Sequence, residues 1–176
     1  MIREATSMDF PDVMSVEREA FGEDDEANLV AKLLDDQTAK PILSLLAIDK
    51  GKAIGHIMFT KAQLEPTVDV NISILGPLAV IPSEQRKGVG GELIKRGLKM
   101  LAESGVDLVF VLGHPEYYPR HGFVQAGKHG FDTPHPILEK NTDAWMVQAL
   151  REGVMNKISG RVICSDTFNE PEYWSE

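Results

Sequence analysis

The sequence lacks the cysteine pairs and the long apolar segments that mark secreted and membrane proteins. It contains one cysteine, Cys164, so no disulfide can form within the chain, which favours a reducing compartment. The first ten residues lack the apolar segment of a secretory signal, and no apolar run reaches the roughly 18–20 residues that a membrane span needs. We therefore expect a cytoplasmic protein with no membrane partner.

An excess of positive charge is also lacking. The formal net charge is −9, which disfavours binding to nucleic acid, because that binding depends on neutralising phosphates. The same charge favours the approach of a cationic substrate, although it also serves solubility alone. His129 and His135 lie in a proline-containing loop without a Cys/His cluster, so we expect no metal site.

What the chain does contain is the composition of one soluble globular domain. It has 176 residues, of which 43% are hydrophobic and 26% charged, with no repeat and no linker. A single domain over residues 1–176 is expected, with residues 168–176 as a frayed tail.

The spacing of apolar residues predicts a mixed α/β fold. The nearly continuous apolar run 106–112 is typical of a central strand covered on both sides, and the helix before it predicts a right-handed βαβ unit with a parallel strand pair. The expected strands cover 1–5, 42–48, 53–60, 68–80, 106–112, 123–126, 144–150 and 160–164, and the expected helices cover 6–21, the region of 29–34, 88–104 and 115–120.

Gly76-Pro77 falls inside an otherwise sheet-like segment. Because proline cannot donate to a sheet ladder, it is expected only at an edge or at a bulge. A bulge would part this strand from its neighbour and leave main-chain groups of Leu78, Ala79 and Val80 available to an extended, amide-bearing ligand. The alternative is an edge strand that tolerates proline.

A glycine-rich turn, residues 85–91, lies at the junction of strand and helix. Glycines permit close approach of a ligand to the backbone, and the unpaired N–H groups and dipole of a helix N-terminus favour an anion such as a diphosphate. The turn lacks the Gly-Lys-Ser/Thr ending of a Walker A loop, and Leu93 occupies the third glycine position of a dinucleotide fingerprint.

The third feature, residues 114–123, directly follows the central strand. Ligands of open α/β sheets bind beyond the carboxyl ends of parallel strands, so this segment and the glycine turn should lie at the same end. A tyrosine there can protonate a leaving thiolate, or it can simply pack and form one hydrogen bond.

Together these segments resemble the GNAT superfamily of N-acetyltransferases. Residues 85–90 match its Gln/Arg-x-x-Gly-x-Gly/Ala signature, residues 75–80 resemble its bulged fourth strand, and residues 118–123 resemble its Tyr-x-x-x-Gly-Phe segment. The resemblance covers about fifty residues, from Leu75 to Ala126. It implies a central mixed, twisted sheet of about seven strands with a splayed parallel pair, flanked by about four helices.

The resemblance also implies roles for individual residues. Tyr118 would be the general acid toward the departing thiolate, and donors near Val80 would polarise the thioester carbonyl. Acetyl-CoA would be the acyl donor, and the amine would attack it directly in a ternary complex. The implied cofactor-binding residues are Leu78, Ala79, Val80, Gln85, Arg86, Lys87, Gly88, Val89, Gly90, Gly91, His114 and Tyr117.

The group that deprotonates the amine is left open. An alkyl ammonium with a pKa of about 10.4 must lose a proton before it attacks. Glu17, His56, His114 and Asp69 are candidates, although the position of Glu17 is more typical of a carboxylate at the edge of the apolar stripe that reaches solvent. Cys164 is interpreted as a small buried residue.

The leading hypothesis is an acetyl-CoA-dependent N-acetyltransferase for a primary amine of a small molecule or a protein. The alternatives are a non-catalytic acyl-CoA-binding sensor module, and an acyltransferase that uses another acyl chain or an oxygen acceptor. We expect the loop 127–141 and the first two helices to frame the acceptor pocket. Dimers are common in the superfamily, so a homodimer is compatible with the sequence.

Overall fold

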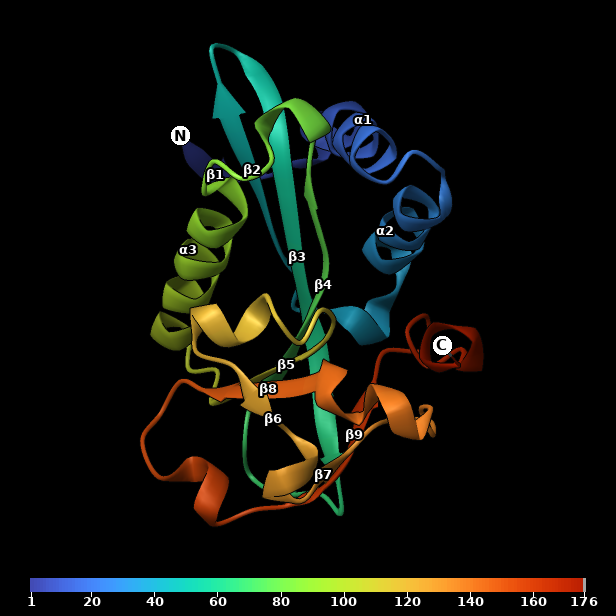
Figure 1. The fold of residues 1–176 in the computed structure, drawn as a ribbon, viewed down its shortest axis with the longest axis vertical. Coiled ribbons are helices and arrows are strands. Elements are labelled where there is room, and N and C mark those ends of the chain that lie inside the picture. Colours follow the sequence, from blue (N-terminus) through green and yellow to red (C-terminus); the bar gives the residue numbers. More distant parts are fainter. Residues whose placement is uncertain (176) are drawn as a thin grey trace.

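The computed structural model describes residues 1–175, and its centre is a nine-stranded mixed sheet (Figure 1). The strand order is β1-β2-β3-β4-β5-β8-β6, while β9 pairs with the far end of β3 and with β7. The strands are β1 (Ile2–Glu4), β2 (Leu43–Asp49), β3 (Lys52–Glu65), β4 (Ile72–Val80), β5 (Leu108–Leu112), β6 (Val124–Gln125), β7 (Phe131–Asp132), β8 (Trp145–Ala149) and β9 (Gly160–Cys164).

Three α-helices and several 3-10 helices connect the strands. The α-helices are α1 (Phe10–Phe21), α2 (Asp25–Asp35) and α3 (Val89–Glu103). The fourth expected helix, after β5, is the 3-10 helix η4 (Tyr118–His121). The other 3-10 helices are η1 (Ser7–Asp9), η2 (Gln37–Ala39), η3 (Pro82–Glu84), η5 (Gly127–His129), η6 (Glu139–Ala144), η7 (Val154–Asn156) and η8 (Pro171–Trp174).

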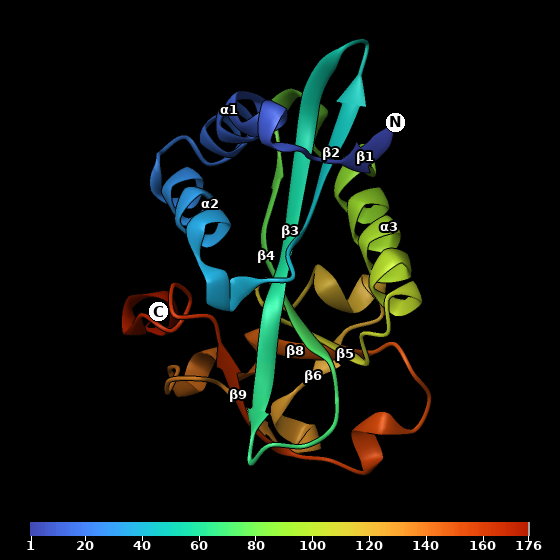
Figure 2. The ribbon, with the colours of Figure 1, turned by 180° about the vertical axis from the view of Figure 1, so that it is seen from behind.

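The helices cover opposite faces of the sheet. Figures 1 and 2 show α3 on one side of β3 and β4, with α1 and α2 on the other. The helix α3 joins β4 to the parallel strand β5, so the predicted βαβ unit is confirmed. This arrangement follows from the apolar stripe of each helix, which must be buried against the sheet.

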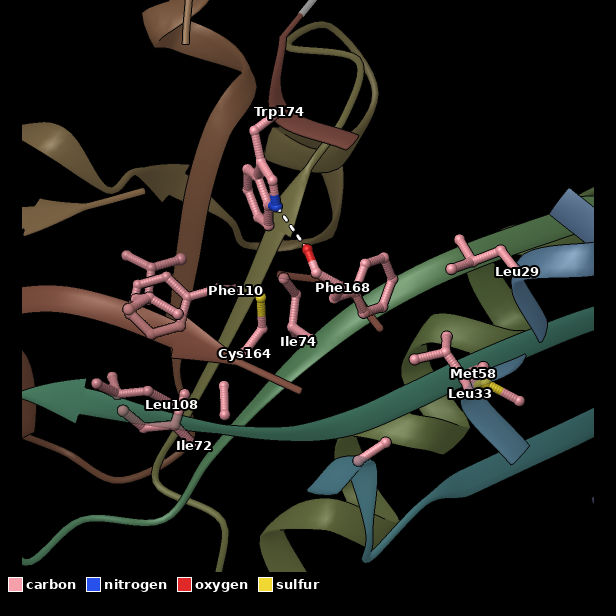
Figure 3. Close-up of a cluster of buried hydrophobic side chains, with 14 of the residues drawn as sticks. Leu29, Leu33, Met58, Ile72, Ile74, Leu108, Phe110, Cys164, Phe168 and Trp174 are labelled. Carbon is pink, nitrogen blue, oxygen red and sulfur yellow. Dashed lines mark hydrogen bonds between the residues drawn. The ribbon is translucent and has the colours of Figure 1, made fainter. Parts of the chain in front are cut away.

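Each face of the sheet has its own hydrophobic core. On the α3 face, Phe59 packs against Gly97 so closely that a Cβ atom there would lie 2.3 Å from the ring. On the α1/α2 face, Leu33, Met58 and Ile74 lie in a cluster that extends to the C-terminal segment (Figure 3). Two complete cores explain how a chain of this size folds without disulfides.

The C-terminal segment is packed, which differs from the frayed tail expected over residues 168–176. Phe168 and Trp174 are buried, and Trp174 Nε1 donates a hydrogen bond of 2.7 Å to the carbonyl of Phe168 (Figure 3). Glu176 lies outside the described residues. The segment therefore closes the lower part of the α1/α2 core.

The carboxylate of Asp36 ties this segment to the end of α2. It accepts hydrogen bonds from the main-chain N–H groups of Thr38 and Thr167, each 2.9 Å long. Burial alone would raise the pKa of Asp36, but the hydrogen bonds from Thr38 and Thr167 outweigh burial and lower it to about 2.

Two other segments differ from the sequence-based expectation. Residues 66–71 form a loop, and β4 begins only at Ile72, so the alternation of Val68 and Val70 was wrongly assigned to a strand. The loop expected over residues 127–141 contains β7, which pairs with β9. None of the helices within residues 1–175 is long and apolar enough to cross a membrane.

Candidate active site

The strands β4 and β5 part near the middle of the sheet. They pair only where Ile72, Ser73 and Ile74 face residues 108–110, yet β4 continues to Val80. Beyond Ile74, the strand pairing described for β4 is with β3 alone. A stretch of β4 main chain is thus left without a strand partner on the β5 side.

A β-bulge lies where this parting begins. Gly76 and Pro77 of β4 stand opposite the single residue Met58 of β3, so the register shifts there. Proline has no N–H to contribute to the ladder, which is why the irregularity falls at this position. The register shift confirms the predicted bulge, and β4 as a whole is an inner strand that pairs with β3 and β5, although at Pro77 it pairs with β3 alone.

The turn that opens α3 exposes main-chain N–H groups. Arg86 and Gly88 adopt left-handed conformations, with φ angles of 64° and 89°. The N–H of Glu92 bonds to the carbonyl of Gly88 at 3.0 Å, which leaves the preceding helical N–H groups without intrahelical partners. The positive end of the helix dipole lies at the same place, so the turn is suited to an anion.

Two aromatic side chains lie over the first turn of α3. A Cβ atom on Gly90 would lie 2.5 Å from Tyr117 Oη, and one on Gly91 would lie 2.9 Å from His121 Cε1. The absence of a side chain at both positions lets Tyr117 and His121 approach the helix this closely. Burial raises the pKa of Tyr117. Burial lowers the pKa of His121, and the positive charge of Arg120 lowers it further.

A hollow of about 620 Å³ opens beside this turn. Its wall includes Lys95, Arg120 and His121 together with the carboxylate of Glu92, so the lining is of mixed charge. Lys87, by contrast, points to Glu84, with 3.2 Å between Nζ and Oε2. The suitability of this region for an anion therefore rests on the main-chain N–H groups of the turn rather than on an excess of cationic side chains.

Tyr118 is buried at the start of η4, where its ring packs against Gly113. The centroid of its ring lies 5.1 Å from that of Tyr117 and 5.7 Å from that of Phe123. Burial, and secondarily the neighbouring Tyr117, raise its pKa, so the hydroxyl stays protonated at neutral pH. The side chain can act as a proton donor and not as a base.

Other predicted residues take different positions. Gln85 Nε2 donates to the carbonyl of Val80 at 2.9 Å, so this side chain ties the turn to the end of β4. The side chain of His114 is exposed, while its carbonyl accepts the N–H of Tyr117 at 3.1 Å and shapes the turn. Cys164 is buried, and burial raises the pKa of its thiol to about 12, which is consistent with a packing role.

The candidates for a proton acceptor separate into two groups. Asp69 is exposed in the loop that leads into β4, whereas Val80 lies at the other end of that strand. Glu17 and His56 are both buried and contact each other, with 2.7 Å between Glu17 Oε2 and His56 Nδ1. Glu17 therefore does not reach solvent, and the expectation of an exposed carboxylate at the stripe edge is wrong.

Two residues of this region were not singled out from the sequence. His121 belongs to η4 and packs against the first turn of α3, and its proximity to Gly91 depends on the tertiary fold. Ser44 contacts His56, with 2.8 Å between Oγ and Nε2. A polar residue within the apolar strand 42–48 is the one signal that could have drawn attention to Ser44.

Comparison with known proteins finds relatives that match most of the chain. The family model described as an acetyltransferase (GNAT) domain matches residues 1–126. The chain is 49% identical over 160 residues to the uncharacterized N-acetyltransferase YjhQ of Escherichia coli K12, covering 90% of this chain and 88% of that protein.

Solved structures also resemble the fold. The GNAT family N-acetyltransferase YhbS from Escherichia coli, in complex with CoA, has a TM-score of 0.87 at 30% identity, covering 97% of this chain and 92% of that chain. A GNAT family acetyltransferase from Brucella melitensis, in complex with acetyl-CoA, has a TM-score of 0.75 at 26% identity, covering 96% and 97%. The parted strands, the helix turn and these similarities lead to one conclusion: the chain belongs to the GNAT superfamily of N-acetyltransferases.

Proposed function

We propose that the protein transfers an acetyl group from acetyl-CoA to a primary amine of a small molecule or a protein. The observation that carries the proposal is the parting of β4 from β5 beside the anion-suited turn of α3. The similar proteins solved with CoA and acetyl-CoA support it. The single buried cysteine supports a cytoplasmic location as part of the same proposal.

In the proposed complex, the cofactor extends along β4 as an added strand. Its diphosphate accepts hydrogen bonds from main-chain N–H groups of residues 86–91, and its pantetheine arm pairs with residues 78–80. N–H groups near Val80 polarise the thioester carbonyl. Because the Val80 carbonyl already accepts from Gln85, we assign Gln85 the role of fixing the turn against the strand.

Tyr118 is assigned the role of general acid. Its hydroxyl, kept protonated by burial, donates a proton to the thiolate as the C–S bond breaks. The amine attacks the thioester directly, so no acyl-enzyme forms and Cys164 takes no part. His114 and Tyr117 precede Tyr118 on the segment after β5 and are assigned contacts to the cofactor.

The proposal is tested by binding and by turnover. Calorimetry should detect binding of acetyl-CoA, and a free-thiol assay with a panel of primary amines should detect transfer. Binding without thiol release from any amine would indicate the sensor alternative. Release with alcohols alone, or with a longer acyl chain alone, would indicate the other acyltransferase alternatives.

A pair of glycine substitutions tests where the cofactor binds. Gly90→Val places a branched side chain against Tyr117 at the anion turn and should abolish binding of acetyl-CoA. Gly127→Val is the matched control, since a Cβ atom there meets nothing within 4 Å and the residue is remote in sequence from the turn. Equal affinity of the two variants for acetyl-CoA would place the diphosphate elsewhere.

A further inference from the structure

A buried chain of three polar side chains links α1 to the sheet. Ser44 Oγ lies 2.8 Å from His56 Nε2, and His56 Nδ1 lies 2.7 Å from Glu17 Oε2. His56 and Glu17 are 0% exposed, whereas Ser44 is half-buried. We call these three residues the relay; it is accessible at the Ser44 end and enclosed at the Glu17 end.

The relay is incompletely satisfied. Within residues 1–175, Glu17 Oε1 is a buried oxygen without a hydrogen-bond partner. A buried polar atom left unpaired is unfavourable, and more so when it is charged. Apolar side chains of similar volume are often at least as stabilising as a buried pair of this kind, so stability alone does not account for the pair.

Proton uptake is the use that the arrangement favours. If Glu17 is ionised and His56 neutral, the enclosed pair carries one uncompensated negative charge. A proton gained at His56 Nε2 produces an imidazolium beside a carboxylate, which leaves the interior with no net charge. The connectivity is that of an imidazole oriented at Nδ1 by a carboxylate and open to proton transfer at Nε2.

The relay lies beside the part of β4 that is assigned to the cofactor. His56 pairs across the sheet with Ala79, one of the β4 residues assigned to the cofactor. Ser44 pairs with Met58, which stands opposite the β4 bulge, so Ser44 is two strand spacings, roughly 10 Å, from β4. That distance can be spanned by an acceptor amine and a bridging water.

The other ionisable side chains on α1 and β3 are exposed: Asp12, Arg18, Glu19, Lys52, Lys61 and Glu65. The segment Ile72–Val80 carries none, and Asp49 is exposed at the end of β2. Near the β1 end, Arg3 and Asp9 pair with each other at 2.8 Å. Among the ionisable side chains of α1, β2 and β3, Glu17 and His56 are thus the buried ones.

We propose that the relay is the proton acceptor of the transfer reaction, an inference that rests on the proposed function. The acceptor ammonium loses one proton through the Ser44 hydroxyl to His56 Nε2, and Glu17 holds the resulting imidazolium. The amine then forms the C–N bond while the C–S bond breaks. Of its three N–H protons, one passes to the relay, one replaces the proton that Tyr118 gives to the thiolate, and one stays in the amide.

The test compares Glu17→Gln and His56→Asn with the wild type. The control is Glu19→Gln, which removes an exposed carboxylate from the same helix. With acetyl-CoA and the best amine of the panel, kcat/KM of both relay variants should fall about 100-fold or more at pH 7. The loss should shrink toward threefold near pH 10, where the alkyl amine deprotonates unaided. The affinity for acetyl-CoA should not change.

Ser44→Ala keeps the test decisive if either buried substitution unfolds the protein, because Ser44 is half-buried. It should lower kcat/KM about tenfold at pH 7, with the same recovery at high pH. Rates equal to wild type, or lowered by one constant factor at every pH, would overturn the relay while leaving the proposed function intact. A wild-type protein that acetylates no amine would refute the proposed function, and the relay's role with it.

Discussion

Replacing Tyr118 by phenylalanine separates the chemistry of this residue from its packing. The ring packs against Gly113, Tyr117 and Phe123, and phenylalanine preserves those contacts. No hydrogen bond from the Tyr118 hydroxyl is found within residues 1–175, so its removal should change the free energy of unfolding by less than about 1 kcal/mol. Loss of a general acid should lower kcat about 10²–10⁴-fold, or about 3–5 kcal/mol at 1.36 kcal/mol per decade.

Three measurements check this prediction. Urea denaturation gives the stability, calorimetry gives the affinity for acetyl-CoA, and thiol release gives kcat. Tyr173→Phe on η8 is the control and should be unchanged in all three. Because burial raises the pKa of Tyr118, its ionisation should not lower the wild-type rate below about pH 10. A Tyr118→Phe enzyme with kcat within threefold of wild type would refute the assignment.

Three further predictions concern stability. Gly97→Ala should destabilise by about 1–2 kcal/mol in urea, because overpacking against Phe59 exceeds the gain in helix propensity; a more stable variant would contradict the packing. Asp36→Asn should lower the free energy of unfolding by about 1–2 kcal/mol above pH 4–5, where the ionised carboxylate accepts the N–H of Thr167. Because the pKa is lowered to about 2 in the folded protein, this stability is lost as the pH falls through that value, and the variant should equal the wild type below pH 2. A loss that does not depend on pH would refute the prediction. Trp174→Ala should cost about 3–5 kcal/mol, and a loss under 1 kcal/mol would indicate that the C-terminal segment does not stabilise the core.

Much of the fold could be predicted because its strongest patterns are local. The apolar run that became β5 and the amphipathic stripe of α3 each report their own burial. The prediction of a strand at Val68 and Val70 was wrong because alternation over a few residues also fits a loop that packs apolar side chains. The two-residue strands β6 and β7 are too short to leave a periodic signal.

The C-terminal segment was unpredictable for another reason. Its composition is acidic and resembles a solvated tail, yet Trp174 is buried and Thr167 binds Asp36 from a position 131 residues away in sequence. A contact of that separation leaves no trace in the local pattern, and the entropy lost by ordering the segment is offset only by partners elsewhere in the chain.

The bulge at Pro77 and the anion-suited turn around Gly88 could be predicted from the amino acids alone. Both depend on backbone properties of single residues, the missing N–H of proline and the conformational freedom of glycine. Only the tertiary structure decided that Glu17, His56 and Ser44 meet. Their contact requires α1 to lie across β3 and β4 with one rotation, and β2 to pair with β3 in one register, and both are set by packing over the whole sheet.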